Sequence, residues 1–565
     1  MAQPMPSISK TTSAPEHEET VEISGSNASS VSGRPSTDLG VVRVTPRRFW
    51  LLSIGLYLGL FLSMMDASIV ASSLHSIAIE FEVLISANWV ALAYAVAECS
   101  CAGVFARMSD IVGRRNAFVT AHVLFLGSSL GCGFSHNLTQ LVVFRTFQGL
   151  GGSGLFALST VFMPEVCPDH LLEYACGLAS IVVVIALITG PIAGGILSQY
   201  ASWRWIFWVN GPLSATAMAF CFAFWPRKQD IIHVPRRPWK SFDFAGSTLL
   251  IAGVGLVVFS LQNVGVSTTD IWAKAVFIAP IVVGAACWVA LFVWVYNTDC
   301  RPCGYTVMSV LPLSLFRNRV YASGTLTTLF TGFPLFLLAF SLPLRAQIVS
   351  GKTSLDSATV LLPMLGAFAV GCVVSVACSV RRNYLFETML AGSLLCVVGS
   401  GLLTTVSGPK DDNRLLGFIT IVGLGIGLSI SATTGLTGIE IAPQSYASAQ
   451  GIIAQARLLG GSFGISASSI YWHNQITRLV HGPVPPQVAE FLSQDHGVLS
   501  SQLKLVVEQA SSSAFRDSMV ISTVMSGAAV LTALMGFNCE HQDTRQKRKD
   551  LVRAHMPPPT HSDCP

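Results

Sequence analysis

Residues 173–198 read EYACGLASIVVVIALITGPIAGGILS, and after Glu173 this stretch contains no Asp, Glu, Lys or Arg. A run of about 20 apolar residues is long enough for a helix to cross the hydrocarbon core of a bilayer. Thirteen other stretches have the same character: residues 49–71, 85–107, 115–134, 138–163, 204–225, 243–262, 271–296, 319–345, 355–378, 385–405, 413–437, 447–470 and 515–537. The sequence therefore predicts an all-α polytopic membrane protein with about 14 transmembrane helices.

The composition agrees with a membrane protein, because 51% of the 565 residues are hydrophobic and only 11% are charged. Soluble globular chains carry roughly 25% charged residues. A surface that faces lipid explains the deficit, since charged side chains are costly there. The net charge of +4 gives no indication of nucleic-acid binding.

The cysteines suggest neither a disulfide framework nor a metal site. Most of the 14 cysteines lie inside apolar runs, where a thiol behaves as a small hydrophobic group. Cys300-Arg301-Pro302-Cys303 is a C-x-x-C motif without a second pair, so we expect no metal or redox role for it. We expect no cofactor, and without a His-rich or metal-binding cluster we expect no enzymatic activity.

Lysine and arginine residues orient the chain, because they favour the cytoplasmic side of a membrane. With the N-terminus inside, the inner segments hold about 21 of them and the outer segments about nine. Both ends are then cytoplasmic. Residues 1–48, rich in Ser, Thr, Pro and Glu, are expected to be a disordered tail, and residues 539–565 a basic tail.

A weak internal repeat is visible in the glycine-rich helices. Residues 190–195 read GPIAGG in the fifth predicted helix, and residues 460–464 read GGSFG in the thirteenth. If residues 243–296 form a linker pair, the thirteenth helix is the fifth of a second half. We therefore predict six-helix bundles at 49–226 and 319–538, since internal repeats of this kind are typical of transporters.

Ionisable side chains well inside the predicted spans, away from the span ends, are few: Asp66, Glu98, Arg145 and Arg457, with Arg204 near an end. Such residues are costly in a bilayer and usually face the bundle interior or a cavity. Asp66 and Arg145 fall at similar depth in the outer halves of their helices, whereas Glu98 falls near the middle. The alternatives to functional roles are a structural hydrogen bond for Glu98, a snorkelling Arg145 and an Arg457 that only links two helices.

Residues 106–115, ARMSDIVGRR, form a short inner loop in which Gly113 allows a tight turn. Asp110 is placed to accept a hydrogen bond from an arginine or to cap the next helix. The alternative is a simple positive-inside anchor. In the fourth helix, Arg145 and Gln148 precede residues 149–154, GLGGSG, which fit G-x-G-x-x-G; no strand precedes them, so we expect no dinucleotide site.

These segments resemble the major facilitator superfamily and, within it, the fourteen-helix drug:proton antiporters of fungi. The family signatures of the inner loop, of helix four and of helix five match at Ser109-Asp110, Gly113, Arg114-Arg115, Arg145, Gln148-Gly149, Gly177, Gly190-Pro191 and Gly194-Gly195. They depart at Ala106 and Ala186, where the family usually has Gly. Residues 65–70, 203–212 and 312–319 resemble further signatures of the fourteen-helix group.

The resemblance implies a major facilitator fold and a proton-coupled efflux transporter that exports toxins, secondary metabolites or drugs by alternating access. The residues implied in the proton and substrate pathway are Asp66, Glu98, Arg145, Gln148 and Arg457. Those implied in gating are Asp110, Gly113, Arg114 and Arg115. Those of the antiporter motif are Gly177, Gly190, Pro191, Gly194 and Gly195.

The energy source is expected to be protons, because the sequence lacks the nucleotide-binding motif G-x-x-x-x-G-K-[ST]. We favour Asp66 as proton carrier, paired with Arg145, and Glu98 as substrate contact or second carrier; the reverse assignment stays open. The expected partners are a small-molecule substrate, protons and the lipid bilayer, and the protein is expected to be a monomer. The plasma membrane is the expected location, with a vacuolar or vesicle membrane as the alternative.

Other functions stay open at this point. A siderophore or other organic-solute transporter of the same superfamily is the nearest alternative. A non-transporting membrane sensor or a membrane enzyme is a more distant one.

Overall fold

The apolar runs of the sequence form long helices. The computed structural model describes residues 46–70, 73–74, 77, 80–81, 89–167, 171–226, 238–266, 274–299, 309–379, 383–406, 411–441, 445–481, 501–537 and 546, and every element among them is a helix. They belong to one unit, residues 40–565. The predicted disordered tail up to residue 45, the Cys300–Cys303 motif and, Gln546 apart, the basic tail 539–565 lie outside the described residues.

The helices that precede the predicted linker form what we call the N-terminal group. They are α1 (Pro46–Ile69), α3 (Trp89–Val112), α4 (Arg114–Gly133), α5 (Leu138–Val166), α6 (Leu172–Tyr200), α7 (Arg204–Trp208) and α8 (Asn210–Phe224). Asn137 begins α5 as an N-cap, since its side chain accepts a hydrogen bond from the backbone N–H of Gln140 at 2.8 Å.

A short 3-10 helix, η4 (Trp239–Ser241), precedes the predicted linker pair, which is α9 (Phe244–Val266) and α10 (Ala275–Asp299). The later helices form what we call the C-terminal group. They are α11 (Leu313–Phe316), α12 (Arg319–Ile348), α13 (Ser354–Thr359), α14 (Leu362–Ser379), α15 (Leu385–Leu403), α16 (Asp412–Glu440), α17 (Tyr446–His481) and α19 (Ser501–Met535).

Within the described residues, 12 helices or helix pairs are long and apolar enough to cross a membrane. The two other predicted spans correspond to α4 and α17, which are long helices with more polar residues. Their polar side chains include His122 and Ser129 in α4 and Gln455 in α17, and all three are buried inside the protein. Internal packing therefore accounts for the lower hydropathy of these two helices.

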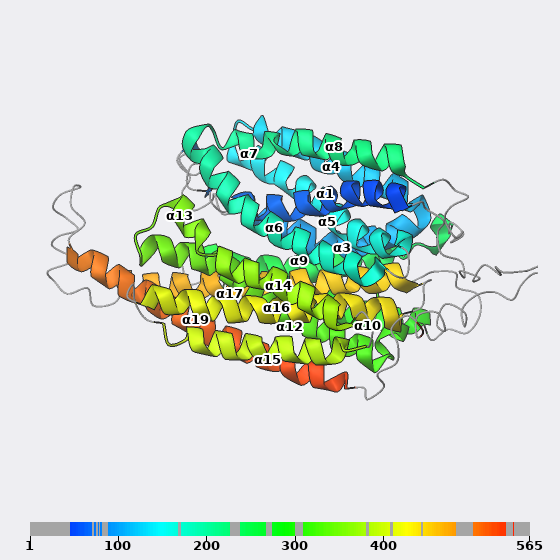
Figure 1. Ribbon diagram of the computed structural model, residues 1–565. Coiled ribbons are helices and arrows are strands. Elements are labelled where there is room, and N and C mark those ends of the chain that lie inside the picture. The colour runs from blue at the N-terminus through cyan, green and yellow to red at the C-terminus, as the bar shows by residue number, and fades with distance from the viewer. Residues whose placement is uncertain are drawn as a thin grey trace, which may run out of the picture. The chain divides into compact units, whose positions relative to one another are not determined.

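The helices of each group pack mainly on one another (Figure 1). In the N-terminal group, α1 packs against α5, α6 and α8, and α5 packs against α3 and α4. In the C-terminal group, α12 packs against α16, α17 and α19, and α16 packs against α14 and α15. The two groups meet where α6 contacts α14 and α16, and where α17 contacts α3 and α5.

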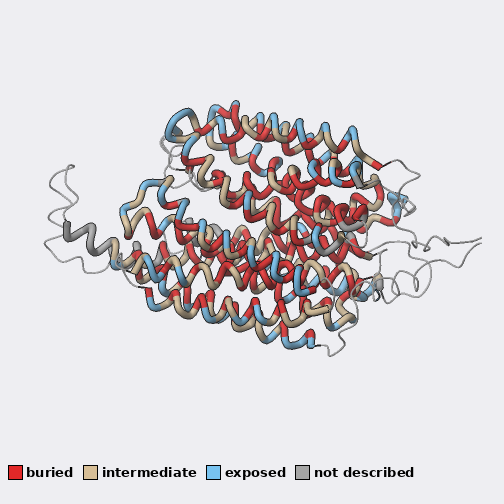
Figure 2. The backbone as a smooth tube through the Cα atoms, in the orientation of Figure 1, coloured by how far each residue is buried: buried red, intermediate tan, exposed pale blue. Residues whose placement is uncertain are grey.

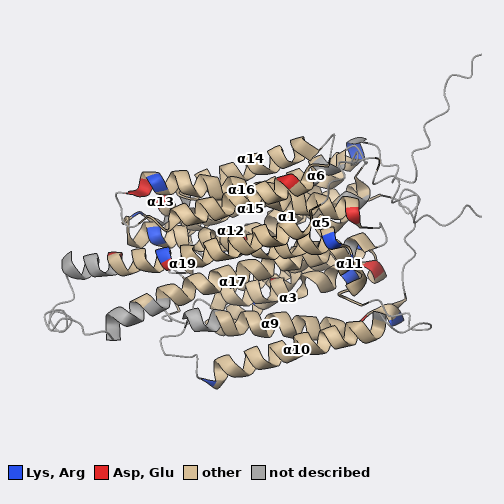
Figure 3. Ribbon diagram, turned by 90° about the horizontal axis from the view of Figure 1, so that it is seen from below, with Lys and Arg blue, Asp and Glu red and all other residues tan. Residues whose placement is uncertain are grey.

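The linker pair lies against both groups. Helix α9 contacts α3 on one side and α17 on the other, and α10 packs on α9 at the edge of the protein (Figure 3). Only 11% of the apolar window of α10 is buried, so nearly all of this helix is available to lipid. Figure 2 shows that the buried residues lie mainly on the sides of the helices that face one another.

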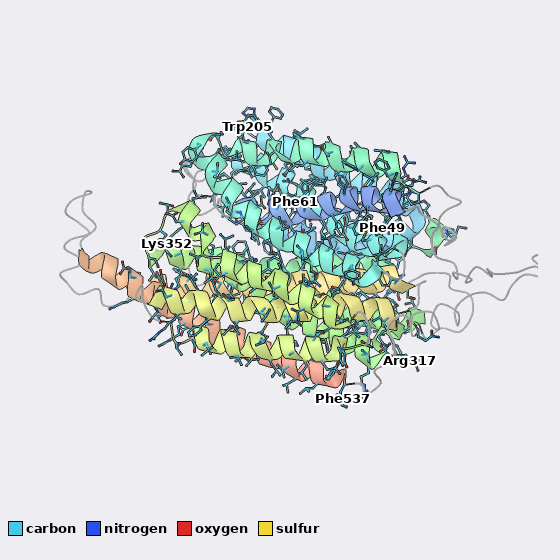
Figure 4. All side chains as sticks on the ribbon, viewed as in Figure 1. Phe49, Phe61, Trp205, Arg317, Lys352 and Phe537 are labelled. Atoms are coloured by element: carbon cyan, nitrogen blue, oxygen red, sulfur yellow. The ribbon has the colours of Figure 1, made fainter. Side chains whose placement is uncertain are left out.

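Charged side chains lie mainly near the ends of the helices, as expected for a membrane protein (Figure 3). Phe49, Arg317 and Phe537 lie at one end, and Trp205 and Lys352 lie at the other (Figure 4). The first three are predicted to be cytoplasmic and the last two external, and the structure places the two sets at opposite ends; which end faces the cytoplasm stays a prediction.

Candidate functional site

The most deeply buried charges form a network between α1, α5 and α8. Asp66 of α1 and Arg145 of α5 are both 0% exposed and form an ion pair. Gln148 Nε2 and Asn210 Nδ2 each donate a hydrogen bond to Asp66 Oδ1 at 2.9 Å. Asp66 thus faces three nitrogen donors, and its carboxylate accepts all three bonds only while it is ionised.

Arg145 is held from several sides. Its Nε donates to the carbonyl oxygen of Val90 at 3.1 Å, and Nη1 donates to Gln148 Oε1 at 3.0 Å. The guanidinium carbon lies 4.3 Å from the centre of the Tyr94 ring and 5.7 Å from that of Phe207. The predicted pairing of Asp66 with Arg145 is therefore present, and Gln148 belongs to the same network.

Asn210 was not among the residues singled out in the sequence. It begins α8, is fully buried, and also donates to Ser129 Oγ of α4 at 3.0 Å. Ser129 in turn donates to the carbonyl oxygen of Phe207 at 2.8 Å. The sequence feature that could have indicated Asn210 is an amide side chain in an apolar helix, because a buried amide needs hydrogen-bond partners.

Glu98 lies on α3 in a separate contact with α1 and α5. It is 3% exposed, and its Oε1 is 2.7 Å from Ser63 Oγ. Ser63 Oγ is also 2.9 Å from the carbonyl oxygen of Gly152. A serine hydroxyl has one hydrogen, so full hydrogen bonds form at both contacts only if Glu98 is protonated and donates to Ser63.

The titratable groups that face this contact are few. Tyr94, one turn before Glu98, donates to the backbone carbonyl oxygen of Ser63 at 2.9 Å. Asp66 and Arg145 act on Glu98 through their charges, with opposite signs. Glu98 therefore sits beside the ion pair without a cation bonded to it among the described residues.

Ion pairs stabilise the inner loop between α3 and α4. Asp110 pairs with Arg114 at 2.7 Å and with Arg107 at 3.9 Å, and Arg114 also bonds to Ser109. Gly113 has φ 96°, a conformation that a residue with a side chain rarely adopts. The sequence prediction that Asp110 contacts an arginine such as Arg114 agrees with this geometry. Arg115 instead lies over the ring of Phe222, 5.1 Å from its centre.

The same loop is hydrogen-bonded to the segment that follows the linker pair. Arg107 donates a hydrogen bond to the carbonyl oxygen of Ser309 at 2.7 Å. Ser309 lies just before the C-terminal group. Asp243, next to α9, accepts from Trp294 Nε1 of α10 at 2.9 Å and from the backbone N–H of Val310 at 3.3 Å. A small cavity lies between Arg107, Asp110 and Asp243.

The end of the N-terminal group that is predicted to be external has its own set of charged contacts. Glu80 accepts from Trp203 Nε1 at 2.5 Å and from Arg204 Nη2 at 2.8 Å, and Arg204 also donates to the carbonyl oxygen of Ser135 at 2.8 Å. Burial raises the pKa of Glu80, but the hydrogen bonds from Trp203 and Arg204 and the Arg204 charge bring that pKa below its ordinary value of 4.5.

The glycines of the antiporter motif differ in what surrounds them. A Cβ at Gly190 would meet Ser68 Oγ and come within 3.0 Å of the backbone of Met65 and Ile69, so α6 and α1 are in close contact there. A Cβ at Gly177 would come within 2.6 Å of Val376 in α14. Gly194 is buried and Pro191 lies inside α6 without ending it. A Cβ at Gly195 would meet nothing within 4 Å, so no close contact requires that glycine.

Arg457 of α17 lies apart from the Asp66 network. It lines two small cavities whose walls come from α1, α5 and α6 on one side and from the C-terminal group on the other. Its Nη2 donates to Thr434 Oγ1 at 3.2 Å. The structure therefore brings Asp66, Arg145 and Gln148 together, places Glu98 beside them, and puts Arg457 at the seam between the groups.

Buried charges between helices that span a membrane, and cavities lined from two helix groups, are features of a multi-pass membrane transporter. Residues 56–465 match the family described as the Major Facilitator Superfamily, and the chain belongs to this superfamily. The superfamily predicted from the motifs is thus confirmed.

Relatives and a solved structure agree. The MFS-type transporter FPY5 of Fusarium mangiferae is 28% identical over 502 residues, which cover 86% of this chain and 83% of FPY5. The efflux pump dotC of Dothistroma septosporum is 27% identical over 454 residues, which cover 80% of this chain and 74% of dotC. The crystal structure of the human organic anion transporter MFSD10 (TETRAN) has a similar fold, with a TM-score of 0.52, 14% identity, and coverage of 86% of this chain and 100% of that one. The predicted major facilitator fold is confirmed.

Proposed function

We propose that this protein is a proton-coupled exporter of small organic molecules that works by alternating access. Its relatives include a protein named as an efflux pump in a fungus. The observation that carries the proposal is the contrast between two buried acids, since Asp66 faces three nitrogen donors whereas Glu98, among the described residues, faces the hydroxyl groups of Ser63 and Tyr94 and no nitrogen donor. Such a pair supplies one fixed charge and one site that can gain and lose a proton.

The contacts favour Glu98 over Asp66 as the proton carrier, which is the reverse of the assignment favoured from the sequence. Protonation of Asp66 would leave Arg145 as a buried cation without a counter-charge, at a cost of several kcal/mol. Protonated Glu98 instead donates to Ser63, whose own hydrogen then reaches the Gly152 carbonyl oxygen. Loss of that proton breaks one of the two bonds and loosens the contact between α1, α3 and α5.

Alternating access would move residues 49–226 against residues 319–538, with residues 243–296 as the linker pair. The contacts between the two groups support the division into two moving halves, because most of these contacts involve only two helices, α6 and α17. We propose that Asp110 and Arg114 belong to an inner gate, and that Arg107 connects this loop to Ser309 in the segment between the linker pair and the C-terminal group.

We further propose that the protein is a monomer in the plasma membrane with both termini in the cytoplasm. A vacuolar or vesicle membrane is the alternative location. Protease protection of a tag on each terminus, in sealed vesicles of known orientation, tests the topology. A tag digested from the external face would contradict it.

The proposed function is tested in two steps. Metabolites are first compared between the cells and the medium of a deletion strain and of its parent, and the compound retained most by the deletion strain is labelled. Its transport is then measured in membrane vesicles with and without an imposed pH gradient. We expect a gradient-driven component in the wild type, and we expect Glu98→Gln to lose that component while it retains exchange of substrate without a gradient.

Glu508→Gln is the matched control, since it makes the same change near the start of α19, away from the described network. It should keep the gradient-driven component. Normal gradient-driven transport by Glu98→Gln would exclude Glu98 as the carrier, and the absence of any such component in the wild type would exclude proton coupling.

A further inference from the structure

The two cavities at the seam contain an uncompensated positive charge. Arg457 is the one charged side chain among the described residues that line them. The remaining walls are mostly apolar and include the rings of Phe156, Phe336 and Phe368. A ligand in this place would thus meet a guanidinium group beside an aromatic and aliphatic surface.

Arg457, which is partly buried, differs from the fully buried arginines in having no acid paired with it among the described residues. Arg145 pairs with Asp66, Arg107 with Asp110, and Arg345 with Asp412. In the described part of the chain, the hydrogen-bond partner of Arg457 is the neutral Thr434, and its buried Nε has no acceptor. A guanidinium has five N–H donors, so most of its bonding capacity is unused.

The nearby charges do not cancel that of Arg457. Asp66 and Arg145 neutralise each other, and Glu98, which contacts Ser63, lines neither of the two cavities. The seam therefore carries a net positive charge. A buried cation is costly unless an anion accompanies it, so the site favours a negatively charged ligand.

The position of Arg457 is fixed by the surrounding backbone. A Cβ at Gly332 of α12 would lie 2.5 Å from the Arg457 carbonyl oxygen, so the two helices are in contact at this residue. Gln450 donates to the backbone of Thr434 at 3.2 Å and holds α16 against α17 one to two turns away. The backbone that carries the Arg457 side chain is therefore held between α12 and α16.

We propose that the seam binds an organic anion, with a carboxylate or similar oxyanion on Arg457 and an apolar, aromatic body against Phe156, Phe336 and Phe368. The inference rests on the proposed export function, for which it names the substrate class: amphipathic organic acids. Arginine suits this role because its planar donors match a carboxylate with two parallel hydrogen bonds.

The test is ligand binding to the purified full-length protein, without any pH gradient. The probes are 1-naphthoate, 1-naphthamide and 1-naphthylmethylammonium, which share one ring system and differ in charge, with biphenyl-4-carboxylate and its amide as a second scaffold. We expect the carboxylates to bind at least about tenfold more tightly than the amides and the ammonium probe not to compete. Arg457→Gln should abolish this preference, and Arg457→Lys should keep it in weakened form.

Arg414→Gln is the matched control, because it removes an arginine whose side chain is 77% exposed. It should bind as the wild type does. Equal binding of acids and amides, an anion preference that survives Arg457→Gln, or no binding of either carboxylate up to its solubility limit would overturn the proposal. Anion-selective binding without gradient-driven export would retain the anion site and refute the proton coupling, so the two failures are distinguishable.

Discussion

Asp66→Asn and Glu98→Gln replace one carboxyl oxygen by an amide nitrogen in each case, yet we expect a large loss of stability for the first and little change for the second. At Asp66, the new N–H₂ group would face a nitrogen donor on at least one side, and Arg145 would lose its counter-charge. Breaking a buried ion pair by removing one partner costs about 3–5 kcal/mol. This corresponds to roughly a hundred- to several-thousandfold change in the folding equilibrium.

At Glu98, the amide nitrogen of Gln would donate to Ser63 Oγ, which lies 2.7 Å from Glu98 Oε1, as a protonated carboxyl group would. The contact between Ser63 and the Gly152 carbonyl oxygen would also be kept. The net change in hydrogen bonding is therefore small, about 1 kcal/mol or less. Glu98→Gln should thus resemble the protonated wild type in stability.

The measurement is the thermal unfolding midpoint of both variants, purified in the same detergent at the same pH as the wild type. We expect a clear decrease for Asp66→Asn and a midpoint near that of the wild type for Glu98→Gln. Equal midpoints for Asp66→Asn and the wild type would refute the fixed ion pair. A larger loss for Glu98→Gln than for Asp66→Asn would refute the protonated state of Glu98.

Three further predictions concern other parts of the chain. Gly190→Val should reach the membrane yet lose efflux, because its side chain would meet the α1 backbone. The control Gly195→Val has open space around the new Cβ and should transport normally. Efflux is measured at matched expression, and normal transport by Gly190→Val would refute the close contact. Asp110→Ala should lower the transport rate by about tenfold or more by releasing Arg114, with membrane insertion largely unchanged, and unchanged kinetics would remove Asp110 from the gate. Glu80 has a lowered pKa when folded, so its stabilising contribution is present above its ordinary value of 4.5 and is lost as the pH falls through the lowered value. Unfolding midpoints across this range should therefore show a decrease that Glu80→Gln lacks, and identical profiles would contradict the bond to Arg204.

The sequence predicts the spanning helices well, because about 20 consecutive apolar residues have few alternatives to a membrane helix. Their ends are less predictable. The predicted span 447–470 corresponds to α17 (Tyr446–His481), and the predicted span 204–225 consists of α7 and α8. Apolarity marks the part of a helix inside the bilayer, whereas polar turns beyond it are set by local hydrogen bonds.

The ionisable residues of the candidate site could be predicted because each is costly in a bilayer. Their neutral partners could not. Ser63 and Asn210 are polar residues in apolar helices, where such residues are common packing elements. Their contacts with Glu98 and Asp66 join helices far apart in the chain, and only the packing of those helices reveals them.

The repeated glycines connect the fold to the proposed motion. Gly190 brings α6 against α1, and a Cβ at Gly464 of α17 would meet the backbone of Phe333 in α12, so each glycine-rich helix is tied to the first long helix of its own group. The same two helices also supply the contacts to the other group. We expect a helix that packs closely on its own group, and makes fewer contacts with the other group, to move with its own group. Arg457, carried by α17, would then shift relative to α1, α5 and α6 in every cycle, so a bound anion would keep Arg457, Phe336 and Phe368 of the C-terminal group and exchange its contact with Phe156 of α5.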